Sequence, residues 1–100
     1  MASDTGELLL CCLLWARDGE AAGLTAYEDE VLALIPGHGG EVLQRAQSDG
    51  VDGSPHEVQV YRFDSQAALD SYLADPRRSA RLDERDRVIE RTELFPVTFL

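Results

Sequence analysis

The longest apolar stretch of the chain runs from Leu8 to Trp15. It is about half as long as a membrane-spanning helix, and it is typical of a central strand that is covered on both faces. Successive side chains of a strand point to opposite faces. One face therefore carries Leu8, Leu10, Cys12 and Leu14, and the other carries Leu9, Cys11, Leu13 and Trp15. Both faces of this strand are expected to need cover.

Apolar residues recur every three or four positions from Glu20 to about Pro36, which predicts an amphipathic helix. Its apolar stripe consists of Leu24, Tyr27, Val31, Leu34 and Ile35. The opposite side, with Glu28, Asp29 and Glu30, is expected to be a solvated face. Successive helical residues point about 100° apart, so these carboxylates cannot converge on a metal ion. The glycine-rich segment 36–40 marks the end of the helix.

Alternating polar and apolar residues predict two further strands, over 41–47 and 56–63, joined by the polar connection 48–55. In the second of these strands, one face is formed by Val58, Val60 and Arg62, and the other by Gln59, Tyr61 and Phe63.

The last third of the chain predicts two helices and a strand. Asp64 and Ser65 offer an N-cap to a helix whose buried stripe is Ala68, Leu69, Tyr72 and Leu73. Asp75 and Pro76 then begin a short helix over 76–84. A final strand covers 88–100 and is interrupted at Pro96, which favours a sheet edge, a bulge or a strand that leaves its sheet.

The element order β-α-β-β-α-β predicts a ferredoxin-like α+β fold, in a single domain over 1–100 with a flexible segment at 1–6. Right-handed crossovers place both helices on one face of a four-stranded antiparallel sheet with strand order 4-1-3-2. The other face would expose a larger apolar patch than a soluble monomer tolerates. We therefore expect a homodimer packed sheet to sheet, in which the segment after Pro96 reaches the partner.

Composition narrows the classes of partner. The chain has 100 residues, 44% of them hydrophobic, and a formal charge of −10, with no lysine. Such a chain repels phosphate backbones and anionic headgroups, so neither nucleic acid nor a membrane is expected as a partner. The acidic segment before Leu8 does not suit a signal peptide, and we expect a cytoplasmic protein. Cys11 and Cys12 are adjacent, which suits neither a disulfide nor a metal site, and no metal or cofactor is expected.

A resemblance to a known superfamily rests on this element order, on the apolar first strand, on the segment 56–86 and on the terminal VIERTELFPV. Over about residues 7–97 the chain resembles the dimeric α/β-barrel superfamily. It looks most like small, uncharacterised stand-alone members in which a Phe-x-Ser strand end leads into an Ala-rich helix, an aromatic residue and an Asp-Pro or Ser-Pro turn. The matching residues here are Phe63, Ser65, Ala67, Ala68, Tyr72, Asp75 and Pro76.

The resemblance implies several activities and does not choose among them. Relatives include cofactor-independent monooxygenases that oxidise polycyclic quinols, muconolactone isomerase-like enzymes, haem-degrading enzymes and stress-responsive proteins without a settled activity. The haem-degrading branch presents a His and an Asn, and some quinol monooxygenases use an Asn-Trp pair. This sequence contains no asparagine, which argues against haem and leaves Trp15 without its companion.

His38 is the candidate catalytic residue, since flanking glycines could let its imidazole face a cleft as a general base. The alternative is a surface histidine that interacts with the end of a helix. Arg62 projects from an otherwise apolar face, where it must find an anionic ligand or a carboxylate such as Glu90. Arg77 and Arg78 either hold an anion at a helix N-terminus or offset the acidic surface.

The ligand-binding candidates are Arg62, Tyr27, Tyr61, Tyr72 and Trp15. The aromatic members could line a pocket for a flat hydrophobic or aromatic molecule, or they could simply fill a small core. The first interpretation predicts a small-molecule binding protein, with a cofactor-independent monooxygenase or an isomerase as its enzymatic form. The alternative is a dimeric interaction or stress-response module without a pocket. Whether the protein is an enzyme stays open at this point.

Overall fold

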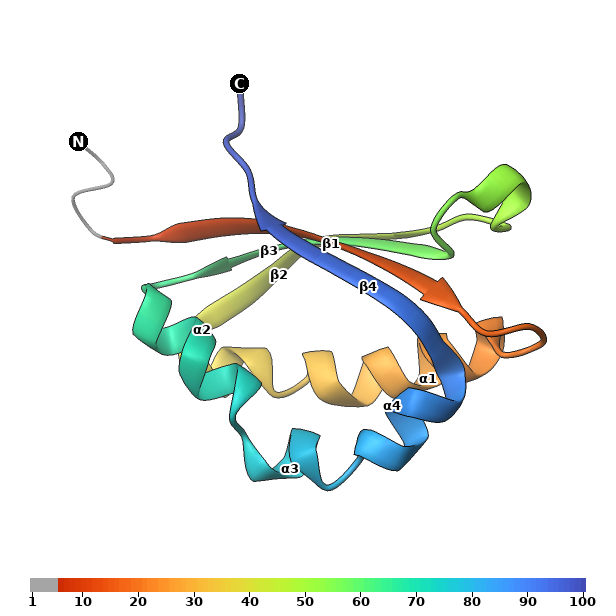
Figure 1. Ribbon diagram of the computed structural model, residues 1–100. Coiled ribbons are helices and arrows are strands. Elements are labelled where there is room, and N and C mark those ends of the chain that lie inside the picture. Colours follow the sequence, from red (N-terminus) through yellow and green to blue (C-terminus); the bar gives the residue numbers. More distant parts are fainter. Residues whose placement is uncertain (1–5) are drawn as a thin grey trace.

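The computed structural model describes residues 6–100, which form one four-stranded antiparallel sheet with the α-helices on one of its faces (Figure 1). The strands are β1 (Leu8–Ala16), β2 (Gly40–Gln47), β3 (Glu57–Phe63) and β4 (Ile89–Pro96). The α-helices are α1 (Ala21–Leu32), α2 (Gln66–Leu73), α3 (Pro76–Ser79) and α4 (Leu82–Val88), and two 3-10 helices are η2 (Ile35–His38) and η3 (Val51–Gly53). The flexibility expected of residues 1–6 falls, except for Gly6, outside the described residues.

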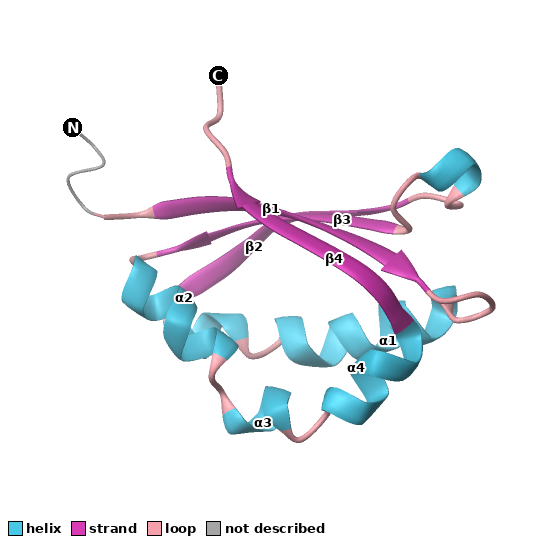
Figure 2. Ribbon diagram, viewed as in Figure 1, coloured by secondary structure: helices cyan, strands magenta, loops and turns pink. Residues whose placement is uncertain are grey.

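The strand order β2-β3-β1-β4 confirms the predicted topology. β1 lies between β3 and β4 and is antiparallel to both. Its helix-covered face is buried and consists of Leu10, Cys12, Leu14 and Ala16. Its other face, with Leu9, Cys11, Leu13 and Trp15, is only half-buried. The helix layer and the open face are visible on opposite sides of the sheet in Figure 2.

The first helix is shorter than predicted. α1 ends at Leu32, and the chain then turns into η2, which places Pro36 near its start because proline has no N–H to donate. η2 ends at His38 and is followed by Gly39, whose φ of 74° favours glycine. The segment therefore changes direction before β2 rather than continuing as one helix to Pro36.

The second helical region begins as predicted and then divides. Ser65 Oγ accepts a hydrogen bond from the Ala68 amide at 3.1 Å, and Asp75 Oδ1 accepts one from the Arg77 amide at 2.8 Å, so both residues are N-caps. The helix predicted over 76–84 is instead two short helices, α3 and α4, because the chain bends at Arg81, which has non-helical dihedral angles. α4 runs to Val88, which is fully buried, and β4 begins only at Ile89.

Two predictions of burial are wrong. Leu73 was expected in a buried stripe but is 42% exposed, because it lies at the last turn of α2 beside a cavity. Glu28 was expected on a solvated face but is buried, because α1 turns this side chain towards β3.

The last strand ends at Pro96, where the sequence predicted an interruption. β4 is an edge strand that stops at Pro96, and the Val97 amide donates a last hydrogen bond to the Leu9 carbonyl at 2.9 Å. Residues 97–100 then leave the sheet on the side away from the helices (Figure 1). Within residues 6–100, none of the helices has the length and apolar character needed to cross a membrane.

Candidate functional site

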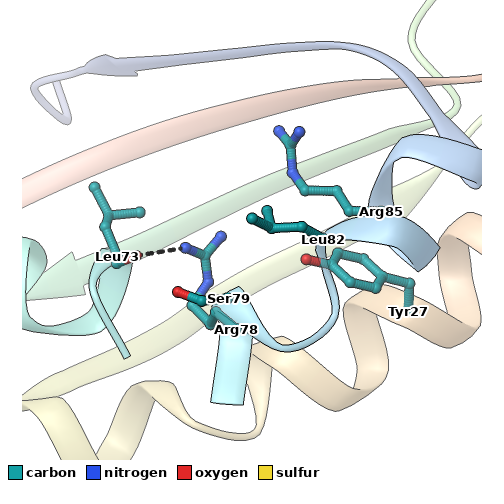
Figure 3. Close-up of a pocket in the computed structure, with 6 residues that line it drawn as sticks. All are labelled: Tyr27, Leu73, Arg78, Ser79, Leu82 and Arg85. Atoms are coloured by element: carbon teal, nitrogen blue, oxygen red, sulfur yellow. Dashed lines mark hydrogen bonds between the residues drawn. The ribbon is translucent and has the colours of Figure 1, made fainter. Parts of the chain in front are cut away.

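Two adjoining hollows lie between the helix layer and the sheet. The outer hollow has a volume of about 270 Å³ and is lined by Tyr27, Leu73, Arg78, Ser79, Leu82 and Arg85 (Figure 3). The inner hollow, about 150 Å³, shares Leu73, Arg78 and Arg85 with it and is also lined by Cys12, Leu14, Glu28, Tyr61, Tyr72, Thr92 and Leu94. Since they share part of their walls, we treat the two hollows together and call them the cleft.

Leucines border the cleft. Leu73, Leu82 and Leu94 are 42%, 52% and 38% exposed, and they come from α2, α4 and β4. A single exposed leucine is ordinary, but three around one cavity form an apolar border. Ligand sites commonly combine such a border with a few polar groups inside.

Polar groups without partners lie inside this border. Tyr27 is 1% exposed, and its hydroxyl has no hydrogen-bond partner among the described residues. Figure 3 shows this hydroxyl pointing into the outer hollow, on the side where Arg78 lies. The buried Nε of Arg78 also lacks a partner within residues 6–100, although its Nη1 donates to the Leu73 carbonyl at 3.1 Å. A buried polar group without a partner costs about 1–3 kcal/mol, so a ligand oxygen here would stabilise the fold.

The remaining phenols and the thiol of the cleft are neutral groups. The Tyr72 hydroxyl donates to the Val31 carbonyl at 3.1 Å, and burial raises the pKa of Tyr72 to about 12. Burial, followed by the influence of Cys12, likewise raises the pKa of Tyr61. Burial also raises the pKa of Cys12 to about 12, so this thiol is no nucleophile near neutral pH. Among residues 6–100, no three His, Cys, Asp or Glu side chains are grouped to hold a metal ion.

Guanidinium and carboxyl groups complete the cleft. The Arg78 guanidinium lies over the Tyr72 ring, 4.6 Å from its centroid. Arg85 Nη2 donates to Thr92 Oγ1 on β4 at 3.1 Å, which positions a second cation between α4 and the sheet. Opposite them, Glu28 of α1 faces the inner hollow and accepts a hydrogen bond from Gln59 Nε2 at 2.9 Å.

The structure brings three of the sequence-predicted site residues together and leaves three elsewhere. Tyr27, Tyr61 and Tyr72 line the cleft, whereas Trp15, His38 and Arg62 do not. The role of all six as site residues stays a prediction. Sequence reasoning missed Glu28 and Arg85 and left Arg78 between an anion site and the acidic surface. The spacing of Glu28 from Leu24 and Val31 already placed Glu28 on the buried side of α1.

Trp15 and Arg62 belong to other parts of the sheet. Trp15 Nε1 donates to the Gly53 carbonyl at 2.8 Å, and the Arg91 guanidinium lies 4.3 Å from its ring centroid. Arg62 pairs with carboxylates, as one alternative expected, but Glu90 is not among the partners found. Those partners are Asp64 at 2.7 Å, Glu7 at 3.2 Å and Glu41 at 3.7 Å.

His38 links η2 to the joint between α2 and α3. Its Nε2 lies 2.6 Å from Asp75 Oδ2, and its Nδ1 lies 2.7 Å from Ser71 Oγ. A carboxylate can only accept, so Nε2 donates to Asp75, and in the neutral ring Nδ1 accepts from Ser71. Asp75 is also held by the Arg77 guanidinium at 2.7 Å, so the three residues tie two segments together outside the cleft.

The Asp75 contacts predict an acid-sensitive contribution to stability. The Arg77 side chain, followed by His38, holds the pKa of Asp75 well below its usual range. A depressed folded-state pKa contributes stability that is present above the unfolded value of about 4 and is lost as pH falls. Asp75→Asn should therefore lower the urea midpoint at pH 7, and the difference from the unaltered chain should shrink at pH 3. The exposed Asp18→Asn serves as the control, and an equal deficit at both pH values would contradict the assignment.

Known proteins match this chain in fold, whereas neither a family model nor a curated protein matches it. A protein of unknown function from Rhodopseudomonas palustris has a TM-score of 0.76 and 19% identity, over 96% of this chain and 84% of its own. A dimeric protein of unknown function with a ferredoxin-like fold, from Bacteroides fragilis, has a TM-score of 0.71 and 13% identity, over 94% of this chain and 97% of its own.

A third solved structure, a candidate antibiotic biosynthesis monooxygenase from Bacteroides thetaiotaomicron, has a TM-score of 0.72 and 16% identity, over 95% of this chain and 90% of its own. These likenesses show that the chain has a ferredoxin-like fold. At this level of identity the likeness concerns the fold alone. We therefore infer function from the cleft between helices and sheet.

Proposed function

We propose that the protein binds a small, flat, mainly apolar molecule with an acidic or electron-rich oxygen substituent in the cleft. The observation that supports this most directly is the Tyr27 hydroxyl, which is buried and has no partner within the described residues. The leucine border suits the apolar part of such a molecule, and Tyr27, Arg78 and Arg85 suit its oxygen atoms.

An enzymatic form of this function is a cofactor-independent monooxygenase or an isomerase. A phenolic or quinol-like substrate would suit neutral phenols and two guanidinium groups in an apolar cleft. The similarly folded candidate monooxygenase from Bacteroides thetaiotaomicron supports this direction at the level of fold. The alternative function, an interaction module without a pocket, predicts a filled core. The cleft does not fit that alternative.

The proposed assembly is a homodimer that packs the open faces of two sheets together. This face carries Leu9, Cys11, Leu13 and Trp15 on β1 and Val58 and Val60 on β3, all of them half-buried. Residues 97–100 leave β4 on the same side, where a partner would lie (Figure 1). The similarly folded protein from Bacteroides fragilis, which is described as dimeric, supports a dimer.

Thermal unfolding tests the ligand class. Flat aromatic acids, quinones and short apolar acids are added to the purified protein, because a compound that binds only the native state raises the unfolding midpoint. At a hundredfold excess over Kd the gain is about 2.7 kcal/mol, so we expect a rise of several degrees with an aromatic acid. No response to any class would contradict the proposed function.

Two tyrosine variants locate the ligand. Tyr27→Phe removes a hydroxyl that has no partner, so the ligand-free midpoint should stay equal or rise, while the ligand-induced rise becomes smaller. Tyr72→Phe removes a hydrogen bond to Val31 and should instead cost about 1 kcal/mol without ligand. A full ligand response in Tyr27→Phe would place the ligand outside the cleft.

A further inference from the structure

A carboxyl group is built into the wall of the inner hollow. Glu28 is 6% exposed, and its Oε1 accepts a hydrogen bond from Gln59 Nε2 at 2.9 Å. The same Nε2 donates to Glu57 Oε2 at 2.9 Å, and Glu57 is paired with the guanidinium of Arg45 on β2. Arg45 Nη1 also binds Asp29 Oδ1 at 2.6 Å. These contacts hold Glu28 in place from β2 and β3 and leave it facing the hollow.

Glu28 differs chemically from the other polar groups around it. Arginine stays protonated under all ordinary conditions, and the pKa values of Cys12 and Tyr72 are about 12. Burial followed by the nearby charge of Glu57 raises the pKa of Glu28, while the Gln59 hydrogen bond lowers it. Among the described residues that line the inner hollow, Glu28 is therefore the group suited to take up and return a proton, because a carboxyl group ionises at lower pH than the thiol and the phenols.

The amide of Gln59 positions the Glu28 carboxyl group from β3. Gln59 is fully buried, and its Oε1 has no partner among the described residues. Its Nε2 carries two hydrogens and donates one to Glu28 and the other to Glu57, so two carboxylates hold the amide in this orientation.

Building on the proposed function, we infer that Glu28 is the proton-transfer residue of the cleft and that the bound molecule is an enolisable carbonyl compound with an acidic group. The Glu28 carboxylate takes the proton from the carbon next to the carbonyl. The electrons of the C–H bond form the C=C bond of the enolate, and the negative charge moves to the carbonyl oxygen. Tyr27 and Arg78 supply hydrogen-bond donors for that oxygen, and Glu28 returns the proton to the same or to a neighbouring carbon.

The pH dependence follows from the groups that surround Glu28. These are Cys12 on β1, Arg45 on β2, Glu57 and Tyr61 on β3, Tyr27 on α1, Tyr72 on α2, Arg78 on α3 and Arg85 on α4. Since the base form is required, the rate should rise with pH as Glu28 ionises, with a midpoint above the ordinary glutamate value of about 4.3.

Phenylpyruvate is the probe for this inference, since it joins an aromatic ring and a carboxylate to an enolisable CH2 group. Exchange of its CH2 protons in D2O is followed by NMR, with and without protein, and binding is measured separately by thermal unfolding. We expect the protein to raise the exchange rate above the buffer rate. Glu28→Gln should still bind phenylpyruvate but lose about 10²–10⁴-fold of the protein-catalysed rate. Glu30→Gln, on the exposed side of the same helix, should leave both measurements unchanged.

The outcomes separate this inference from the proposed function. If phenylpyruvate binds and Glu28→Gln exchanges its protons as fast as the unaltered protein, the role of Glu28 is overturned while ligand binding stands. If phenylpyruvate neither binds nor exchanges faster than in buffer, this inference is overturned, and the proposed function is judged by the rest of the compound panel.

Two further measurements test the role of Glu28: the stability of Glu28→Gln and the pH profile of the unaltered protein. A raised folded-state pKa means that ionisation of Glu28 opposes folding above the unfolded pKa, so Glu28→Gln should unfold at an equal or higher temperature at pH 8. If this variant fails to fold, the role of Glu28 is tested by the pH dependence of the exchange rate with the unaltered protein. A rate that does not change between pH 4 and pH 8 would overturn the role of Glu28.

Discussion

Replacing Leu13 by Glu is expected to convert the protein from a dimer into a monomer. Leu13 lies on the open face of β1, between Cys11 and Trp15, where no helix covers it. In a sheet-to-sheet dimer the new carboxylate would be removed from water without a partner, which costs several kcal/mol. Light scattering should give about twice the chain mass of 11.0 kDa for the unaltered protein and about that mass for the variant.

A charge of the same sign on the helix layer is the control for this experiment. Ala26 is exposed on α1, so Ala26→Glu should leave the dimer intact. An unaltered protein that is monomeric at micromolar concentration would contradict the proposed assembly. A Leu13→Glu variant that remains dimeric would move the interface to another surface.

Truncation of Phe63 to Ala is expected to cost about 3–5 kcal/mol of unfolding free energy. Phe63 is fully buried beneath η2 and α2 and packs edge to face on Tyr61, with ring centroids 5.9 Å apart. Its ring also lies 5.6 Å from that of Tyr72. Domains of this size are stable by about 5–15 kcal/mol, so the variant should lose a large share of its stability.

Urea unfolding measures this loss, provided that the slope of the transition is unchanged. Val51→Ala is the control, since Val51 is 56% exposed and should change stability by less than about 0.5 kcal/mol. A loss of less than about 1 kcal/mol for Phe63→Ala would mean that the core closes around the missing ring, contrary to the tight packing described above.

Part of the fold could be predicted because β3 alternates strictly between buried and less buried residues. In β3, Gln59, Tyr61 and Phe63 are buried while Val58, Val60 and Arg62 are not, as the period of two required. Ser65 and Asp75 also cap their helices as predicted, since capping depends on local sequence. The division of the predicted 76–84 helix into α3 and α4 could not be foreseen, because tertiary packing of a short segment decides it.

The cleft was harder to predict than the fold. Grouping the three tyrosines anticipated part of its wall, but Arg78 and Arg85 enter it only because α3 and α4 meet at an angle. Glu28 was misassigned because its neighbours Asp29 and Glu30 are exposed and acidic. Its position four residues after Leu24 and three before Val31 was the better guide, since residues at these spacings share a helix face.

The proline that ends β4 also protects the molecule against aggregation. β4 is an outer strand of the sheet, and an outer strand with free backbone groups can recruit strands from other chains into open-ended fibres. Pro96 removes one backbone donor from this edge, and the exposed Glu90 and Arg91 add charges to it. Growth along the edge is therefore disfavoured, and in the proposed dimer association through the sheet face would stop once two chains have met.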